Sequence, residues 1–486
     1  MFLGLDYGTS EVKALLLDAQ HRVLGTAGAP LQLSRPQPGW SEQHPADWWA
    51  GTLAVCAQLR AAQPHAWQQV QAIGLSGQMH GAVLLDAAGQ VLRPAPLWND
   101  TRAEAECRQM MDELPALPML SGCLAMPGFT APKLRWLATH EPQTFARVAK
   151  VLLPKDWIRL RLTGEHVTDR SDASGTTWLD VARRDWSDEL LALTGLSRAH
   201  MPRLVEGSEP GGTLLASMAT TLGLRPGIVV AGGGGDNAAS AIGMGIVQPG
   251  MGFVSLGTSG VIFVATDRYR PNPHSAVHAY CHALPGQWHQ MSVMLSAASC
   301  LRWARQLLGR ASDAEVEALA AATTPAQREA APIFLPYLGG ERTPHNSATL
   351  RASLHGMGHN TDAAAVAYAV MEGVAFGLAD GHAALQAAGT VVRRLSLVGG
   401  GARSSLWAQM LADLLGTEIV THADSAAGGA LGAARLGWLA VGGELKSVCG
   451  APAVLTLHAP QRGAAGQQLA ERWQRFRALG AAAART

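Results

Sequence analysis

The sequence of 486 residues predicts an α/β protein built from two similar domains. Apolar runs of strand length alternate with segments whose apolar residues recur at helical spacing, as is typical of α/β domains. A strand, a Gly-Thr-Ser turn and a second strand occur at the start of the chain and again near its middle. Because the chain is too long for one hydrophobic core, an internal duplication explains this repeat most simply.

The first copy of the repeated unit begins with the apolar run FLGLD, the turn YGTSE and the apolar run VKALLLDA. This pattern predicts a β-hairpin. Residues 45–62 predict a helix, since Pro45 suits the first helical turn and the apolar residues after it recur at helical spacing. Residues 70–92 then predict two strands around a polar loop that contains glycine.

The second copy is GFVSLGTSGVIFVAT, at 252–266. Further on, LSLVGGGARSSLWAQMLADLLG predicts a strand, a triple-glycine turn and a helix that begins at Ser404 or Ser405. Residues 463–486 predict an amphipathic helix with a frayed end. Between the two copies, IVQPGMG combines proline and glycine, so we place the boundary there and expect domains at 1–245 and 246–486.

The composition is that of a compact globular protein, with 48% hydrophobic and 15% charged residues. A net charge of +1 offers no electrostatic footprint for nucleic acid or an anionic membrane, and we expect neither as a partner. The six cysteines form no Cys-x-x-Cys pair, which favours reduced thiols. No basic leader precedes the first apolar run, and the longest apolar region, 238–265, is interrupted by Gly, Pro and polar residues. We therefore expect no signal peptide, transit peptide or membrane span, and a cytoplasmic location.

The two Gly-Thr-Ser turns, Gly8-Thr9-Ser10 and Gly257-Thr258-Ser259, are candidate phosphate sites. Such a turn presents backbone N–H groups and two hydroxyls, and its glycine lets an oxyanion approach the main chain. Ordinary hairpins use the same residues, so one turn alone is weak evidence. Two turns at corresponding places in two half-chains predict a cleft that holds a polyphosphate from both sides.

Asp6 stands at the end of an otherwise apolar strand, just before the first turn. A carboxylate there is costly to bury unless it is paired or bound to a cation. Mg²⁺ suits this position, because it takes few carboxylates and completes its shell with water and phosphate oxygens. The alternative is that Asp6 accepts hydrogen bonds from N–H groups of its own turn.

Asp236 follows four glycines, Gly232 to Gly235, at the expected start of a helix rich in small residues. The glycines allow close approach of a ligand, and a helix N-terminus supplies amide donors. A hydroxyl nucleophile needs a separate base within hydrogen-bond reach, and we expect Asp236 to be that base. The alternative role for Asp236 is capping of the helix.

These residues belong to a set of motifs through which the chain resembles the FGGY carbohydrate kinases, of the sugar kinase, Hsp70 and actin superfamily. The motifs extend over almost the whole sequence. They are DYGTS at 6–10, PGWSEQHPADWW at 38–49, SGQMHG at 76–81, LWNDTR at 97–102, FTAPKLRWL at 129–137, LLPKDWIRLRLTGE at 152–165, GGGDNAA at 233–239, SLGTSG at 255–260, LPYLGGERTPH at 335–345 and GGGAR at 399–403.

The resemblance implies two ribonuclease-H-like domains around a central cleft, closing on ATP held between the two Gly-Thr-Ser turns. The GGGAR segment, Gly399, Gly400, Gly401, Ala402 and Arg403, would lie near the adenosine. Asp236 would take the proton of the C5 hydroxyl of D-xylulose as this hydroxyl attacks the γ-phosphorus, giving D-xylulose 5-phosphate and ADP. Asp6 would hold the Mg²⁺ complex. SGQMHG and GGGDN favour xylulose as the sugar, and Met79, His80, Asp236 and Asn237 match the family's sugar-binding positions.

Phosphoryl transfer relies mainly on alignment and on compensation of phosphate charge, so we expect the cleft to close on its substrates and exclude water. Several polar residues keep open roles. Asn99, Asp100 and Arg102 either line the sugar cleft or fix a helix start, and Lys13 reaches phosphate or lies solvated on its strand. The group His274, His278, Cys281, His282 and His289 invites a zinc interpretation, but two strands about LPGQ would place Cys281 and His282 on opposite faces, so we expect no metal there.

Other functions remain as alternatives. The enzyme could prefer another ketopentose or a polyol, because one hydrogen bond to a hydroxyl can set specificity. The chain could instead be a catalytically silent sugar sensor on the same fold, although the presence of both Asp6 and Asp236 argues against this. A chaperone-like or filament-forming role is more remote, given SGQMHG and FTAPKLRWL. The sequence leaves the oligomeric state open, a homodimer included.

Overall fold

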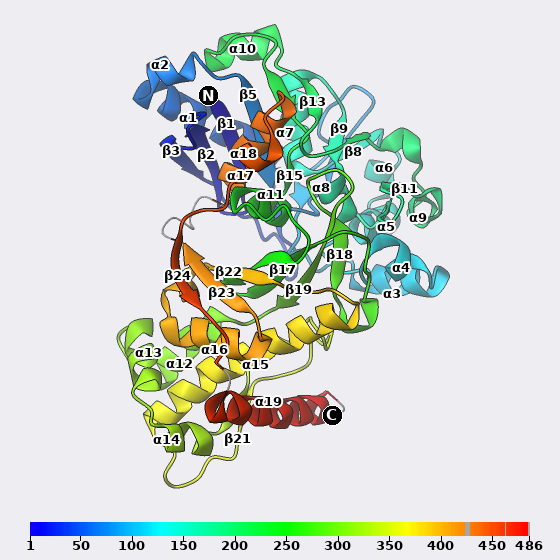
Figure 1. Ribbon diagram of the computed structural model, residues 1–486. Helices are drawn as coiled ribbons and strands as arrows, with labels where there is room; N and C mark the ends of the chain where they lie inside the picture. Colours follow the sequence, from blue (N-terminus) through cyan, green and yellow to red (C-terminus); the bar gives the residue numbers. More distant parts are fainter. Residues whose placement is uncertain (423–427, 462, 485–486) are drawn as a thin grey trace.

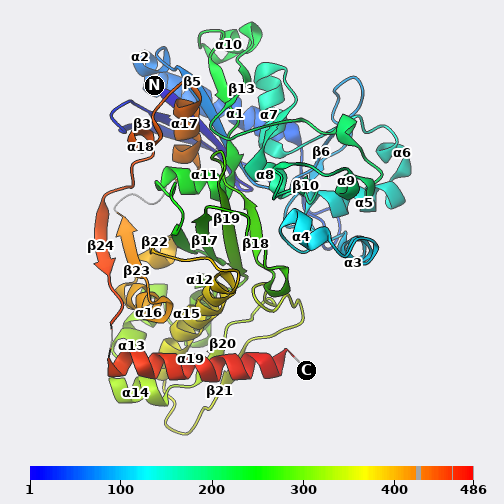
Figure 2. The same cartoon turned by 45° about the vertical axis from the view of Figure 1, so that its right-hand side comes forward.

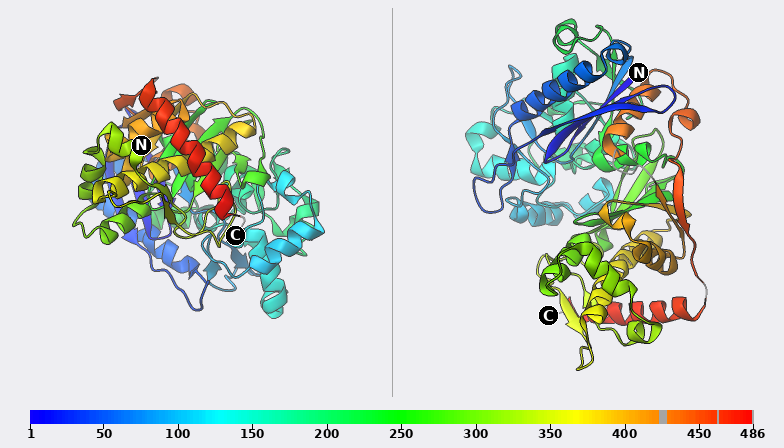
Figure 3. Two further views of the ribbon diagram at one scale, coloured as in Figure 1. Left: turned by 90° about the horizontal axis from the view of Figure 1, so that it is seen from below. Right: turned by 90° about the vertical axis from the view of Figure 1, so that its left-hand side faces the viewer.

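The computed structural model describes residues 1–422, 428–461 and 463–484. It shows two lobes, one with the N-terminus and one with the C-terminus (Figure 1). A seven-stranded sheet forms the centre of each lobe. Figure 3 shows in its right-hand view that the lobes lie along one axis with the chain ends on opposite lobes.

The sheet of the first lobe confirms the expected hairpin at the start of the chain. Phe2 pairs with Leu17 in antiparallel register, and the strand that contains Ala72 runs parallel to the first. In spatial order the strands are β13 (Pro210–Thr213), β14 (Val229–Ala231), β5 (Ala72–Gly77), β1 (Phe2–Tyr7), β2 (Glu11–Leu17) and β3 (Val23–Pro30), with β15 (Gly234–Gly235) also on β5.

The sheet of the second lobe repeats this arrangement. Its strands are, in spatial order, β18 (His278–Cys281), β19 (Trp288–Met294), β17 (Gly260–Thr266), β16 (Met251–Leu256), β22 (Arg394–Val398), β23 (Glu418–His422) and β24 (Val454–His458). Three antiparallel strands are followed by two parallel ones both in β3-β2-β1-β5-β14 and in β19-β17-β16-β22-β23. The two sheets therefore confirm the duplicated α/β fold that the sequence predicts.

Helices at the expected positions cover these sheets. α1 (Pro45–Ala62) has the predicted bounds and buries Trp48, Val55 and Leu59 against β2 and β3. In the second lobe α16 (Ser405–Leu415) begins after Ser404, whose hydroxyl accepts the Trp407 N–H at 3.2 Å. α19 (Ala464–Ala483) is the predicted C-terminal helix and packs on α15, α16 and β20; the last residues of the expected frayed tail, 485–486, lie outside the described residues.

The longest helix, α15 (Ala363–Ala387), forms the core of the second lobe. Among the described residues it is the one helix long and apolar enough to span a membrane by length and composition. However, 78% of its most apolar window is buried inside the protein, which is typical of a core helix.

The remaining elements lie in connections and around the two sheets. In the first lobe and its long insertion they are β4 (Glu42–Gln43), α2 (Pro64–Trp67), β6 (Val83–Leu85), β7 (Ala95–Pro96), α3 (Glu104–Glu113), α4 (Leu117–Ser121), α5 (Thr130–His140), α6 (Pro142–Phe145), β8 (Lys150–Leu152), α7 (Pro154–Thr163), β9 (Val167–Asp169), α8 (Arg170–Ser174), β10 (Leu179–Asp180), β11 (Asp185–Trp186), α9 (Asp188–Ala192), η1 (Arg198–His200), β12 (Arg203–Val205), α10 (Ala216–Leu222) and α11 (Asp236–Gly243). Later in the chain they are η2 (Pro273–Ser275), α12 (Ala298–Leu307), α13 (Asp313–Ala321), α14 (Pro325–Ala330), β20 (Ile333–Leu335), β21 (Ser353–His355), η3 (Gly400–Arg403), α17 (Gly428–Ala440) and α18 (Leu445–Val448).

A late helix, α17, returns to the first lobe and packs between its sheet and α11 (Figure 2). The approach is so close that a Cβ at Gly74 would lie 1.7 Å from Ala433 O, and one at Gly432 would lie 1.7 Å from Ala239 O. Only glycine fits at such backbone contacts. The first lobe in space thus contains chain from beyond residue 246, and the division into 1–245 and 246–486 stays a prediction about the sequence.

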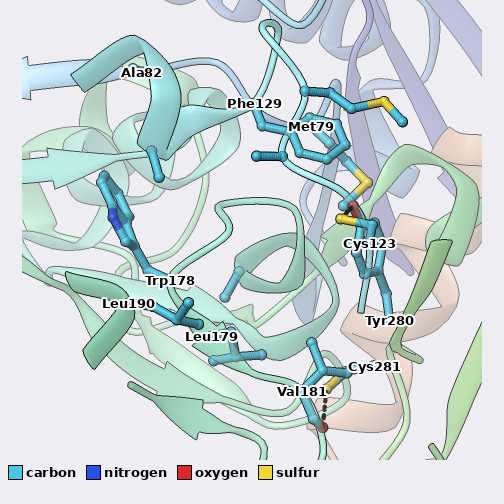
Figure 4. Packing of buried hydrophobic residues seen from close by; sticks show 14 of the residues in the cluster. Met79, Ala82, Cys123, Phe129, Trp178, Leu179, Val181, Leu190, Tyr280 and Cys281 are labelled. Atoms are coloured by element: carbon cyan, nitrogen blue, oxygen red, sulfur yellow. Dashed lines mark hydrogen bonds between the residues drawn. The ribbon is translucent and has the colours of Figure 1, made fainter. Parts of the chain in front are cut away.

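The insertion between β5 and β13 connects the two lobes. Its largest hydrophobic cluster includes Phe129 and Trp178 of the insertion together with Phe263 and Tyr280 of the second lobe. Figure 4 shows Met79, Phe129, Cys123 and Tyr280 within this cluster. All six cysteines of the chain are buried free thiols, as predicted.

Candidate functional site: a cleft between two lobes

A cavity of about 360 Å³ in the second lobe joins the two segments expected to hold the nucleotide. Gly257 and Thr258 of the second turn line it together with Gly400, Gly401 and Arg403. Gly399 has φ 86°, and a Cβ on it would lie 2.7 Å from Leu256 O, so glycine is needed where the two segments meet. The structure therefore brings these two glycine-rich segments together.

The second Gly-Thr-Ser turn is fixed by the start of α12. The N–H of Ala298 donates to Gly257 O at 2.9 Å, and the N–H of Ala297 donates to Thr258 O at 3.0 Å. The side chains of Thr258 and Ser259 are exposed. The turn thus has a fixed backbone and two accessible hydroxyls, as a phosphate site requires.

The first Gly-Thr-Ser turn presents fewer free groups to a phosphate than the sequence predicts. The hydroxyl of Thr9 donates to Gln78 Oε1 at 3.0 Å and accepts the indole N–H of Trp98 at 2.9 Å. Ser10 is exposed, and Gly8 N donates to Glu11 O at 3.1 Å. In this conformation protein partners occupy both the Thr9 hydroxyl and the Gly8 N–H, whereas the exposed hydroxyl of Ser10 is left for phosphate.

A second cavity, of about 270 Å³, lies between the lobes. Asp6 and Asn237 of the first lobe line it opposite Ser255 and Gly399 of the second, and Gly429 of the returning helix α17 lies beside them. The sequence places these residues far apart. Their assembly in one interlobe cavity is the expected position for a nucleotide's phosphates.

The carboxyl of Asp6 lies at the interlobe cavity. Burial raises the pKa of its carboxyl, while the Ser76 hydroxyl, which donates to Asp6 Oδ1 at 2.8 Å, opposes this rise. A Cβ at Gly429 would lie 2.6 Å from Asp6 Oδ2. Asp6 could supply one carboxylate ligand, with phosphate oxygens and water as the other ligands. This donor set fits Mg²⁺. Among the described residues there is no group of three or more His, Cys, Asp or Glu residues able to hold a metal.

Asp236 is the first residue of α11 and is half-buried. Its Oδ1 accepts the backbone N–H of Asn237 at 2.7 Å and the Asn237 amide at 2.9 Å. Burial raises the pKa of Asp236 to about 6; Asp6 adds like-charge repulsion, and the bonds from Asn237 counteract the rise. A carboxylate with this pKa is ionised at neutral pH yet basic enough to accept a proton from a hydroxyl.

Two of the predicted sugar contacts, Met79 and His80, lie in the loop after β5. Met79 is buried, and a Cβ on Gly235 would lie 2.8 Å from its Cγ. His80 stacks on Phe129 with ring centroids 4.1 Å apart. Met79 therefore borders the loop that carries Asp236, whereas His80 packs on Phe129.

The hydrogen bonding of His80 defines which ring nitrogen is free. Nδ1 lies 2.6 Å from the carbonyl of Gly175, and burial lowers the pKa of His80 to about 3. Because a carbonyl only accepts, Nδ1 carries the proton of the neutral ring. Nε2 is thereby left as an acceptor for a sugar hydroxyl.

The structure shows the surroundings of Asn99, Asp100 and Arg102, whose roles the sequence leaves open. Asp100 is fully buried and accepts the Ser41 N–H at 2.7 Å and the guanidinium of Arg102, which lies 3.5 Å above the Trp40 ring. This network bonds the loop at Ser41 to the residues before α3, and whether Asp100 and Arg102 also line the sugar cleft stays a prediction. Asn99 Oδ1 is buried and has no hydrogen bond partner in the part of the chain described.

Lys13 and the histidine-rich segment can also be placed. Lys13 is more than half exposed, 3.7 Å from Glu11, and its side chain borders the interlobe cavity. In the histidine-rich segment, His278 and His289 are buried, and burial lowers the pKa of both well below its usual range.

Sequence reasoning missed one side of the cavity beside the Gly257 turn. Arg302 of α12, Asp313 and Glu317 of α13, and Trp407 of α16 line it. Nothing in the sequence distinguishes these residues from those of ordinary amphipathic helices. Their position at the cavity follows from the packing of α12 and α13 beside the Gly257 turn.

Comparison with known proteins agrees with this geometry. Residues 1–243 match the N-terminal domain and residues 252–441 the C-terminal domain of the FGGY family of carbohydrate kinases. The chain is 50% identical to the xylulose kinases of Escherichia coli (strain K12) and Klebsiella pneumoniae, in each case over 91% of both chains.

Solved structures show the same fold. A xyloylose kinase from Brucella ovis superposes with a TM-score of 0.96 at 49% identity over 99% of both chains. Xylulose kinase from Rhodospirillum rubrum has a TM-score of 0.90 at 28% identity, covering 99% of this chain and 98% of its own. With both of its domains matched, this chain belongs to the FGGY family of carbohydrate kinases.

Proposed function

We propose that this protein has xylulose kinase activity and transfers the γ-phosphate of ATP to the C5 hydroxyl of D-xylulose. The products are D-xylulose 5-phosphate and ADP. The observation that carries this proposal is the assembly of Asp6 and Asn237 with Ser255 and Gly399 in one interlobe cavity, directly beside the half-buried Asp236. The 50% identity to two xylulose kinases supports xylulose as the sugar.

Asp236 acts as the general base in this reaction. Its Oδ1 is occupied by the two N–H groups of Asn237, and no donor from the described part of the chain bonds Oδ2. Asp236 Oδ2 accepts the proton of the C5 hydroxyl while the hydroxyl oxygen forms a bond to the γ-phosphorus. At the same time the bond between the γ-phosphorus and the β,γ-bridging oxygen breaks, and ADP leaves. His80 Nε2, Met79 and Asn237 orient the sugar for this step.

The nucleotide is held by the backbones of both turns, Gly8-Thr9-Ser10 and Gly257-Thr258-Ser259, and by the segment 399–403. Asp6 is the carboxylate for Mg²⁺, which when bound neutralises charge on the phosphates. In this assignment residues 1–245 carry the sugar site and the base, and residues 246–486 carry most of the nucleotide site. We further propose closure of the lobes on both substrates and a cytoplasmic location.

A coupled ADP assay with a panel of sugars tests the proposal. D-xylulose should give the highest kcat/KM among ketopentoses and polyols, and ADP formation should require both sugar and ATP. A higher kcat/KM for another sugar would identify that sugar as the substrate and would leave the protein a carbohydrate kinase of the same family. Absence of turnover with every sugar, together with sugar binding by calorimetry, would instead support a catalytically silent sensor.

A further inference from the structure

The short helix α8 (Arg170–Ser174) contacts the proposed site at both ends. After its C-terminal end, Gly175 O accepts the Nδ1–H of His80 at 2.6 Å. In its first turn, the hydroxyl of Ser171 accepts the N–H of Gly235 at 3.2 Å. Gly235 immediately precedes Asp236 and is the N-cap of α11. One rigid element is thus bonded to both the proposed base loop and the proposed sugar-binding histidine.

Ser171 is itself held by a capping carboxylate. Its hydroxyl donates to Asp169 Oδ1, and the same oxygen accepts the backbone N–H groups of Ser171 at 2.9 Å and Asp172 at 3.1 Å. Because the Ser171 hydroxyl hydrogen is used by Asp169, its lone pair faces Gly235 N–H. The orientation of this hydroxyl is therefore determined before any substrate binds.

A fully buried lysine anchors this arrangement from α7. Lys155 Nζ lies 2.6 Å from Asp156 and Asp169 and 3.1 Å from Asp172, and all four side chains have 0% exposure. Arg159, one turn further along α7, pairs with Asp156 and donates to the carbonyls of Ala231 and Gly232. The glycine loop before Asp236 is thus bonded on one side by Arg159 and on the other by Ser171.

The cost of this buried network indicates a role beyond stability. Desolvating several charges is expensive, and apolar side chains of similar volume often stabilise a fold as well or better. The loop that the network holds contains four consecutive glycines, one with φ 77° at Gly233, and glycine is the least restrained residue of the chain. Misplacing a reacting group by about 1 Å can reduce a rate about 100-fold.

We infer that Ser171, oriented by Asp169 and Lys155, is a positioning residue that fixes the Asp236 carboxylate for proton abstraction. This inference rests on the proposed function, because it assigns Asp236 as the base. Ser171 touches no reacting atom; it acts through Gly235 N–H. No step of the reaction passes through the network itself.

The test compares Ser171→Ala with a matched control on the same helix, Ser174→Ala. The Ser174 hydroxyl donates to Arg170 O at 2.8 Å and accepts the Cys281 N–H at 3.1 Å, so it too bonds a backbone N–H of another element but does not contact the glycine loop. We expect Ser171→Ala to lower kcat about tenfold with KM for ATP and D-xylulose within twofold of the parent. Ser174→Ala should keep kcat within twofold.

A double variant separates positioning from a general loss of structure. In an Asp236→Asn background, Ser171→Ala should cause no further loss of kcat, because no base remains to be positioned. Ser171→Cys fills the volume with a weak acceptor and should also lower kcat, so it serves if Ser171→Ala does not fold. Melting temperatures of all variants identify changes that come from unfolding.

The outcomes distinguish the two ideas. If Asp236→Asn is inactive while Ser171→Ala turns over at the parent rate, the positioning inference fails and the base assignment stands. Equal losses in Ser171→Ala and Ser174→Ala, or a further loss in the double variant, also overturn it, since both indicate a structural role. If Asp236→Asn retains the parent rate, the base assignment fails and the inference fails with it.

Discussion

Replacing Asp236 by Asn should sharply lower turnover and at the same time stabilise the fold. The two side chains have the same shape, and the Asn oxygen can still accept the two N–H bonds from Asn237 that now reach Asp236 Oδ1. The variant therefore removes the basic oxygen and the negative charge with little change in packing. Loss of a general base typically lowers the rate about 100- to 10,000-fold, and we expect kcat to fall within this range.

The stability change can be worked out from the pKa. A rise from 3.8 to about 6 corresponds to about 3 kcal/mol of unfavourable free energy for the ionised carboxylate. Since the side chain is half-buried, solvent screening reduces this to about 1–2 kcal/mol. The Asn variant should recover this amount, which corresponds to a melting temperature higher by a few degrees.

The sign of the pH dependence makes the test specific. The folded-state pKa of Asp236 is raised above the unfolded value, so its ionisation destabilises the fold progressively between pH 4 and 6 and fully above pH 6. The advantage of the Asn variant should be complete at pH 8, reduced to about half at pH 5 and absent below about pH 4. Thermal unfolding monitored by circular dichroism at these pH values, with ADP release as the activity assay, measures both effects.

Two results would refute this reasoning. If the Asn variant phosphorylates D-xylulose at the parent rate, Asp236 is not the base. A stability gain that is the same at pH 8 and pH 5 would show that burial and Asp6 do not destabilise the ionised carboxylate of Asp236. Asp188→Asn serves as the control, because the Asp188 side chain is 75% exposed. It should change neither kcat nor the pH dependence of stability.

Three further outcomes are expected. In the parent enzyme, log kcat/KM for the sugar should fall with unit slope below about pH 6, because the free base is then protonated, and a pH-independent rate down to pH 5 would contradict this. Asp6→Asn should raise at least tenfold the Mg²⁺ concentration needed for half-maximal ADP release, and chelation of Mg²⁺ should stop the parent enzyme; an unchanged Mg²⁺ requirement would argue against Asp6 as the ligand. Gly74→Ala should lower the free energy of unfolding in urea by about 1–3 kcal/mol or more, since its Cβ would lie 1.7 Å from Ala433 O, whereas Gly89→Ala meets nothing within 4 Å and should show only the backbone strain of its φ of 76°.

Local structure was largely predictable from the sequence, because the signals for it lie within a few residues of one another. The hairpin of β1 and β2 follows from two apolar runs around a Gly-Thr-Ser turn, and α1 follows from Pro45 and the helical spacing after it. Ser404 caps α16 as expected, with its hydroxyl on the Trp407 N–H. The motifs also indicated Asp6, which lines the interlobe cavity.

Only the tertiary structure decided what these local pieces meet. It placed α17 against β1 and β5, occupied the Thr9 hydroxyl with Gln78 and Trp98, and bonded the Ser41 N–H to Asp100. Each of these contacts joins two segments that are far apart in the sequence. Periodicity and capping patterns describe the conformation of one segment, whereas such contacts depend on how segments far apart in the chain pack together. For the same reason the sequence indicated Asp236 as a base, but only the packing of α7, α8 and the glycine loop revealed what holds it in place.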